Sequence, residues 1–75
     1  MTEKRYLELL VSQGIELSDK DISNIYDMNL KRSLTSLEFI VFIVKLEEII
    51  GEEFAEENLV GEYVSYKTLK LDKFL

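Results

Sequence analysis

A chain of 75 residues has room for one domain, which we expect to span 1–75, and its 47% hydrophobic residues suffice for a small globular core. The net charge of −6, from fifteen acids and nine bases, would repel a phosphate backbone, so we expect no nucleic-acid partner. Histidine and cysteine are absent, which removes the usual general base, a thiol nucleophile and thiolate metal ligands, and we expect no enzyme activity.

The sequence also bears on where the protein works. The absence of cysteine fits a reducing cytoplasm. Residues 1–6 contain no apolar run of the kind that a signal peptide needs. The longest apolar run, Phe39 to Val44, is too short to span a bilayer. We therefore expect a cytoplasmic, stand-alone monomer that does not insert into membranes.

The first half of the chain predicts one helix followed by a long connection. Apolar residues at helical spacing indicate a helix over 2–11, with Gly14 as its stop. Residues 18–34 form a polar connection with scattered apolar anchors, and we expect a short helical turn near 21–26. The anchors are Ile22, Ile25, Tyr26, Met28, Leu30 and Leu34.

The second half predicts the strongest helix of the chain. It runs from Thr35 to Ile50, with Gly51 just beyond its end. Residues 56–60 suit one or two turns, and helical spacing of Tyr66, Leu69 and the last two residues predicts a final helix over 66–75. The chain is thus expected to be all-α, a small four-helix bundle with three main helices and a short third helix.

The helix over 37–50 carries two apolar stripes on nearly opposite sides. The first stripe comprises Phe39, Phe42, Ile43, Leu46 and Ile50. The second stripe comprises Leu37, Ile40, Val41 and Val44, with Glu47 and Glu48 at its edge. A helix that serves only a core needs one stripe, so either this helix is buried nearly all round or the second stripe is a partner-docking face. In so small a domain we favour docking.

A capping box begins this helix. Thr35 is followed three residues later by Glu38, the spacing at which each side chain bonds the other's free backbone N–H. Ser36 is then the first helical residue, and its hydroxyl lies where unpaired N–H groups and the positive end of the helix dipole favour a phosphodiester. Taken alone, a serine and a leucine at a helix start are common and carry little weight.

Residues Ser36 to Phe54 resemble the segment that follows the attachment serine of acyl and peptidyl carrier proteins. That family typically shows Asp-Ser-Leu, an apolar helix, then Leu-Glu-Glu with two further residues and Gly. Here Ser36-Leu37 is followed by Leu46-Glu47-Glu48 and Gly51, with the family's eleven-residue step from Ser36 to Glu47. The similarity extends more loosely over the whole chain.

The resemblance implies a four-helix bundle in which Ser36 carries a covalent 4′-phosphopantetheine, installed from coenzyme A by a phosphopantetheinyl transferase. It implies cargo held as a thioester, acyl or aminoacyl, and presented to loading and transferring enzymes with basic docking surfaces in fatty-acid, polyketide or nonribosomal-peptide-type biosynthesis. It places the docking surface on Leu37, Ile40, Val41, Val44, Glu47 and Glu48.

One residue departs from the family pattern, because Thr35 stands where the family has the aspartate that assists the transferase and its magnesium ion. The departure implies a dedicated transferase, slower modification or its loss. Ser33 is a rival attachment point, since leucine follows it too, but it shifts the Leu-Glu-Glu step by three residues. The alternative function is a cofactor-free helical interaction module that uses the Leu37–Val44 face.

We expect no metal site. Asp19, Asp21, Ser23 and Asp27 match four positions of a calcium-binding EF-hand loop. Leu30, however, stands where that loop needs a bidentate glutamate, so a solvated acidic loop is the better interpretation.

Overall fold

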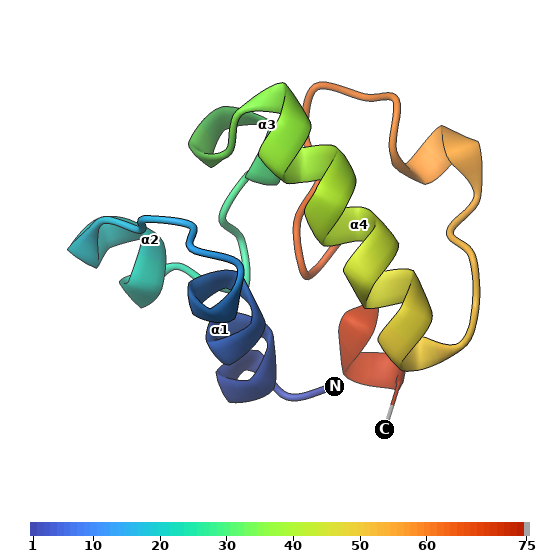
Figure 1. Ribbon diagram of the computed structural model, residues 1–75, viewed down its shortest axis with the longest axis horizontal. Coiled ribbons are helices and arrows are strands. Elements are labelled where there is room, and N and C mark those ends of the chain that lie inside the picture. The colour runs from blue at the N-terminus through green and yellow to red at the C-terminus, as the bar shows by residue number, and fades with distance from the viewer. Residues whose placement is uncertain (75) are drawn as a thin grey trace.

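The computed structural model describes residues 1–74, which are all-helical and contain no strand (Figure 1). None of the helices in this part of the chain is long and apolar enough to cross a membrane. The α-helices are α1 (Glu3–Ser12), α2 (Asp19–Ser23), α3 (Leu30–Ser33) and α4 (Ser36–Ile50), and the 3₁₀-helices are η1 (Glu56–Asn58) and η2 (Leu71–Lys73).

The first helix begins and ends as the sequence predicts. Thr2 caps α1 by accepting a hydrogen bond from the Arg5 N–H at 3.1 Å. At the other end Gly14 adopts a left-handed φ of 76°, and the Ile15 N–H reaches back to the Leu10 carbonyl at 3.2 Å. This is a Schellman stop, in which the left-handed glycine lets the chain turn away without a Cβ penalty.

The connection from 18 to 34 is more ordered than the single turn that the sequence predicts. Ser18 and Asp21 form a capping box for α2, and Asn29 caps α3, which the sequence did not predict. Of the expected anchors, Ile22 is exposed and therefore does not anchor the loop, and Tyr26 is half-buried. The remaining anchors, Ile25, Met28, Leu30 and Leu34, are buried as expected.

The long helix α4 confirms its predicted boundaries. The Glu38 N–H donates to Thr35 Oγ1 at 3.1 Å, and the Thr35 N–H donates to Glu38 Oε1 at 2.9 Å. Gly51 ends the helix with a left-handed φ of 76°, and its N–H donates to the Glu47 carbonyl at 2.9 Å. Ser36 is thereby fixed as the first residue of α4.

The predicted final helix over 66–75 is wrong, so residues 1–74 contain two long helices, α1 and α4, where three main helices were expected. Ser65 and Thr68 exchange hydrogen bonds between side chain and backbone, which closes a single turn. Lys70 then adopts a left-handed φ of 55°, and only the short η2 follows. Leu75, the last residue of the predicted helix, lies outside the described residues.

The turn at Lys70 has a packing cause. In a continuous helix, Leu69 and Leu71 would point to nearly opposite sides, because each residue advances about 100°. The left-handed residue between them redirects the chain, and both leucines are buried. Burial of two leucines therefore outweighs the periodicity that predicted a straight helix.

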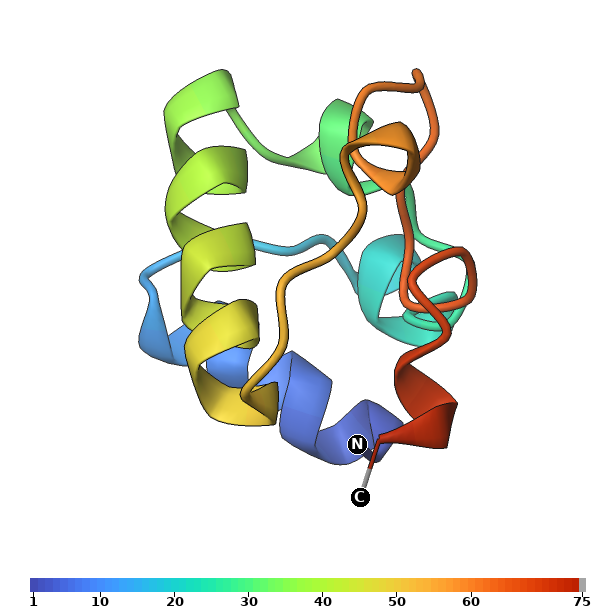
Figure 2. The same cartoon turned by 90° about the vertical axis from the view of Figure 1, so that its right-hand side faces the viewer.

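The core lies between α4 on one side and the C-terminal segment with α2 on the other, with α1 running across one end (Figure 2). The Tyr6 ring of α1 joins the two sides, edge-on to Phe42 at 5.5 Å and to Tyr66 at 5.2 Å between ring centroids. Because α4 forms one wall of the core, only one side of it is covered. The side chains with no exposed surface are Tyr6, Leu10, Leu30, Phe42, Leu46, Val64, Ser65 and Leu71.

Candidate functional site

The two apolar stripes of α4 differ sharply in burial. Phe39, Phe42, Ile43 and Leu46 of the first stripe are buried, and Ile50 at its end is half-buried. In the second stripe the exposed fractions are 71% for Leu37, 58% for Ile40, 47% for Val41 and 48% for Val44. The alternative in which α4 is buried nearly all round is therefore wrong, and four neighbouring apolar side chains face outward along one helix.

Ser36 lies at the start of this exposed face. It is the first residue of α4 and is exposed, and it precedes Leu37 of the second stripe directly. The capping hydrogen bonds are made by Thr35 and Glu38, so the fold does not use the Ser36 hydroxyl as the cap. An exposed hydroxyl that the cap leaves aside is accessible to a modifying enzyme.

A shallow hollow of about 200 Å³ opens beside Ser36, between α3 and the first two turns of α4. Its cation is Lys31, whose Nζ lies 4.6 Å from the centroid of the Phe39 ring. The ring face attracts the ammonium and holds it near α4. A group attached to Ser36 would thus meet one positive charge and an apolar wall. The hollow is lined by Lys31, Leu34, Thr35, Ser36, Phe39 and Ile40.

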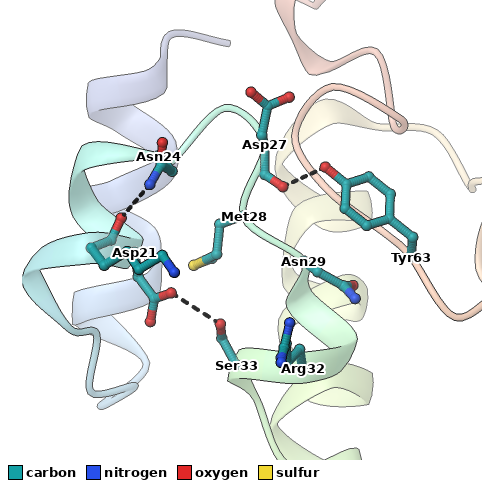
Figure 3. Close-up of a pocket in the computed structure, with 9 residues that line it drawn as sticks. Asp21, Asn24, Asp27, Met28, Asn29, Arg32, Ser33 and Tyr63 are labelled. Atoms are coloured by element: carbon teal, nitrogen blue, oxygen red, sulfur yellow. Dashed lines mark hydrogen bonds between the residues drawn. The ribbon is translucent and has the colours of Figure 1, made fainter.

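The rival serine has a different environment. Ser33 is half-buried at the end of α3, and its Oγ donates to Asp21 Oδ1 of α2 at 3.2 Å (Figure 3). Asp21 also accepts from the N–H of Ser18, the N-cap of α2, so this carboxylate both caps α2 and links it to α3. Modification of Ser33 would break the link between α2 and α3, whereas modification of Ser36 would break no capping bond. The geometry therefore favours Ser36 over Ser33.

Ser33 also lines a surface cavity of about 680 Å³, which lies between α2, α3 and the chain near Tyr63 (Figure 3). The Tyr63 hydroxyl donates to the Asp27 carbonyl across this cavity. Asn24 bonds the Lys20 carbonyl within its own helix. These polar groups are therefore engaged in holding the loops together.

The two glutamates at the far end of the second stripe have separate roles. Glu47 is half-buried, and its Oε2 accepts from the Phe54 N–H at 2.8 Å, which fastens the segment after α4 to the helix. Glu48 is exposed and lies 3.9 Å from Lys45 Nζ. The sequence placed both glutamates at the edge of the stripe, but it gave no sign of the bond to Phe54, because that bond depends on the path of the following loop.

Two further carboxylates lie at this end of α4. Glu52 and Glu53 join Val44, Glu47, Glu48 and Gly51 around a hollow of about 320 Å³. The sequence pattern did not single out Glu52 and Glu53. In residues 1–74 no group of three or more histidine, cysteine, aspartate or glutamate side chains is arranged to hold a metal ion.

Comparison with known proteins assigns the chain to no family. No family model matches the chain, and neither a curated protein nor a solved structure matches it.

Proposed function

We propose that the protein is a carrier that holds acyl or aminoacyl cargo on a 4′-phosphopantetheine arm attached to Ser36. The observation that carries this proposal is the joint exposure of Ser36 and of the second stripe on the same helix. A carrier needs an accessible attachment point next to a surface on which its partner enzymes dock. The cysteine-free sequence suits a reducing cytoplasm, which is the location that we propose.

The residues around Ser36 fit such an arm. The arm is anionic at its attachment point, and Lys31 supplies a nearby positive charge. Further from Ser36 the hollow is walled by the apolar side chains of Leu34, Phe39 and Ile40. When bound, the arm would supply the thiol on which cargo is held as a thioester, which a chain without cysteine cannot supply itself.

We further propose that the fold is a shortened form of the carrier-protein four-helix bundle. Its support is the order of α1, a long connection, α4 and a short turn at η1, which follows the order that the resemblance implies. The departure is the last helix, which is replaced by the turn around Lys70 and by η2. In this proposal η2 and the preceding turn cover the side of the core that a last helix would cover, because Tyr66, Leu69 and Leu71 are buried there.

The partners of a carrier would be a phosphopantetheinyl transferase and enzymes that load and transfer cargo. We propose that they dock on the second stripe, since four adjacent exposed apolar side chains on a small monomer are typical of an interaction surface. Glu48 contributes charge at the edge of this surface, and Glu47 contributes less, because its carboxylate already accepts the Phe54 N–H.

The test is the intact mass after incubation with a broad-specificity phosphopantetheinyl transferase, Mg²⁺ and coenzyme A. We expect the mass to increase by one phosphopantetheine in the native chain and in Ser33→Ala, and to stay unchanged in Ser36→Ala. Ser36→Ala is a fair control, since the capping box is formed by Thr35 and Glu38 and we therefore expect the variant to keep the fold. Circular dichroism checks this point.

Two outcomes would contradict the proposal. A mass gain that persists in Ser36→Ala but is lost in Ser33→Ala would move the attachment to Ser33. No gain in any variant, with transferases of several classes, would favour the cofactor-free interaction module, which would use the same exposed face.

A further inference from the structure

The exposed face of α4 has opposite charges at its two ends. At the Ser36 end, Lys31 and Arg32 of the adjacent helix α3 are exposed. At the Gly51 end, Glu48, Glu52 and Glu53 are exposed. The ends are about 20 Å apart, since each helical residue adds ~1.5 Å. A partner lying along the second stripe would therefore meet positive charge near Ser36 and negative charge at the far end.

The two cations at the positive end form no ion pair within residues 1–74. In residues 1–74 the one ion pair joins Lys45 and Glu48, so neither Lys31 nor Arg32 has an acidic partner there. Glu38, the acid of the first turn of α4, has its Oε1 engaged by the Thr35 N–H. Lys31 is also held against the Phe39 ring. Lys31 is therefore available to a partner at the hollow beside Ser36, while Arg32 lines the neighbouring cavity with Asp21 and Asp27 and adds positive charge at longer range.

From this arrangement we infer that Lys31 and Arg32 determine partner specificity. The fitting occupant of the second stripe is an enzyme surface with carboxylates at the mouth of its active site, where Ser36 enters, and with basic groups about 20 Å away. An enzyme that is basic along its whole docking surface is disfavoured, because two positive surfaces would face each other at the Ser36 end. This inference rests on the proposed function, since it assumes that enzymes act at Ser36.

The experiment is a charge-swap cycle with one transferase of known structure whose active-site mouth is basic. A second form of that enzyme carries Lys→Glu or Arg→Glu changes at the mouth. The second-order rate constant of Ser36 modification is measured for both enzymes with the native chain and with Lys31→Glu/Arg32→Glu. For each carrier variant the result is the ratio of the rate constants of the two enzymes. An effect of Lys31 on the attached arm is the same with both enzymes and therefore cancels in this ratio.

We expect the native chain to prefer the acidic-mouthed enzyme, and the double variant to prefer the basic-mouthed enzyme, with a shift of about tenfold in the ratio at low salt. The shift should shrink in 0.5 M salt, since salt screens exposed charges. The matched control is Lys4→Glu/Lys67→Glu, which changes the net charge equally at two exposed lysines that line none of the hollows beside α4. This control should leave the ratio unchanged.

The failures of the two proposals are distinguishable. If Ser36 is modified but the ratio is the same for the native chain and Lys31→Glu/Arg32→Glu, the specificity inference is wrong and the carrier proposal stands. If the control variant shifts the ratio equally, net charge rather than position is responsible, and the inference is again wrong. If Ser36 is not modified by either enzyme, both proposals fail.

Discussion

Tyr6 has an unusual environment for a tyrosine. Its side chain has no exposed surface, and in residues 1–74 its hydroxyl is the one buried side-chain polar atom without a hydrogen-bond partner. Burial raises the pKa of the Tyr6 hydroxyl well above its ordinary value, so the ring stays neutral. The ring itself is needed, because it packs edge-on against Phe42 and Tyr66.

Replacing this hydroxyl alone should stabilise the protein. We expect Tyr6→Phe to raise the free energy of unfolding by about 1 kcal/mol, because it removes a desolvated polar group and keeps the ring. The control is Tyr66→Phe, which removes a hydroxyl that donates to the Met1 carbonyl and should lower the free energy of unfolding by about 1 kcal/mol. Urea unfolding measures both, and destabilisation by Tyr6→Phe would show that its hydroxyl is bonded in solution.

The elements with strong local signals are the ones that the sequence predicts well. The glycine stop of α1 and the capping box of α4 involve residues within a few positions of each other, so their spacing is visible in the sequence. The helix over 66–75 fails because the deciding interaction, burial of Leu71, depends on the rest of the core. The exposure of the second stripe could not be settled from periodicity, since a fully buried helix and a docking helix have the same pattern.

The start of α4 offers a test that separates folding from modification. Aspartate is as good an N-cap as threonine, so Thr35→Asp should change the free energy of unfolding by less than about 0.5 kcal/mol. Thr35→Ala, the control, removes the cap and should cost about 1 kcal/mol. If the protein resembles carrier proteins in function, Thr35→Asp should speed Ser36 modification about tenfold, the effect of one charge-assisted contact.

The modification rate is measured by the mass assay at limiting transferase, together with urea unfolding of each variant. An unchanged rate for Thr35→Asp would mean that the threonine is not what limits modification of this chain.

At the scale of the whole molecule, α4 divides its apolar surface between the core and the outside. Only the side facing Tyr6 and the C-terminal segment contributes to folding, while the second stripe remains in contact with solvent. The protein thus keeps apolar area that adds little to its own stability, in a chain whose small core leaves a small margin. This is the surface on which we propose that partner proteins bind.

Two isoleucines three residues apart on α4 test this division with the same chemical change. Ile43 is 5% exposed, and we expect Ile43→Ala to lower the free energy of unfolding by about 2–5 kcal/mol. Ile40 is 58% exposed, and Ile40→Ala should change it by less than about 0.5 kcal/mol. Urea unfolding at two protein concentrations measures both. A large, concentration-dependent cost for Ile40→Ala would mean that a second copy covers the stripe, contrary to the expected monomer.

The hydrogen bond from the Phe54 N–H to Glu47 has a consequence for docking. A basic side chain that bound the Glu47 carboxylate would draw negative charge from the oxygen that accepts the Phe54 N–H, and this would weaken the tether between the half-buried Phe54 and α4. Recognition at this end is therefore divided between two kinds of acid. Glu48, Glu52 and Glu53 can bind a partner with no such rearrangement. Binding at Glu47 would instead loosen the segment that follows α4 from Gly51 onward.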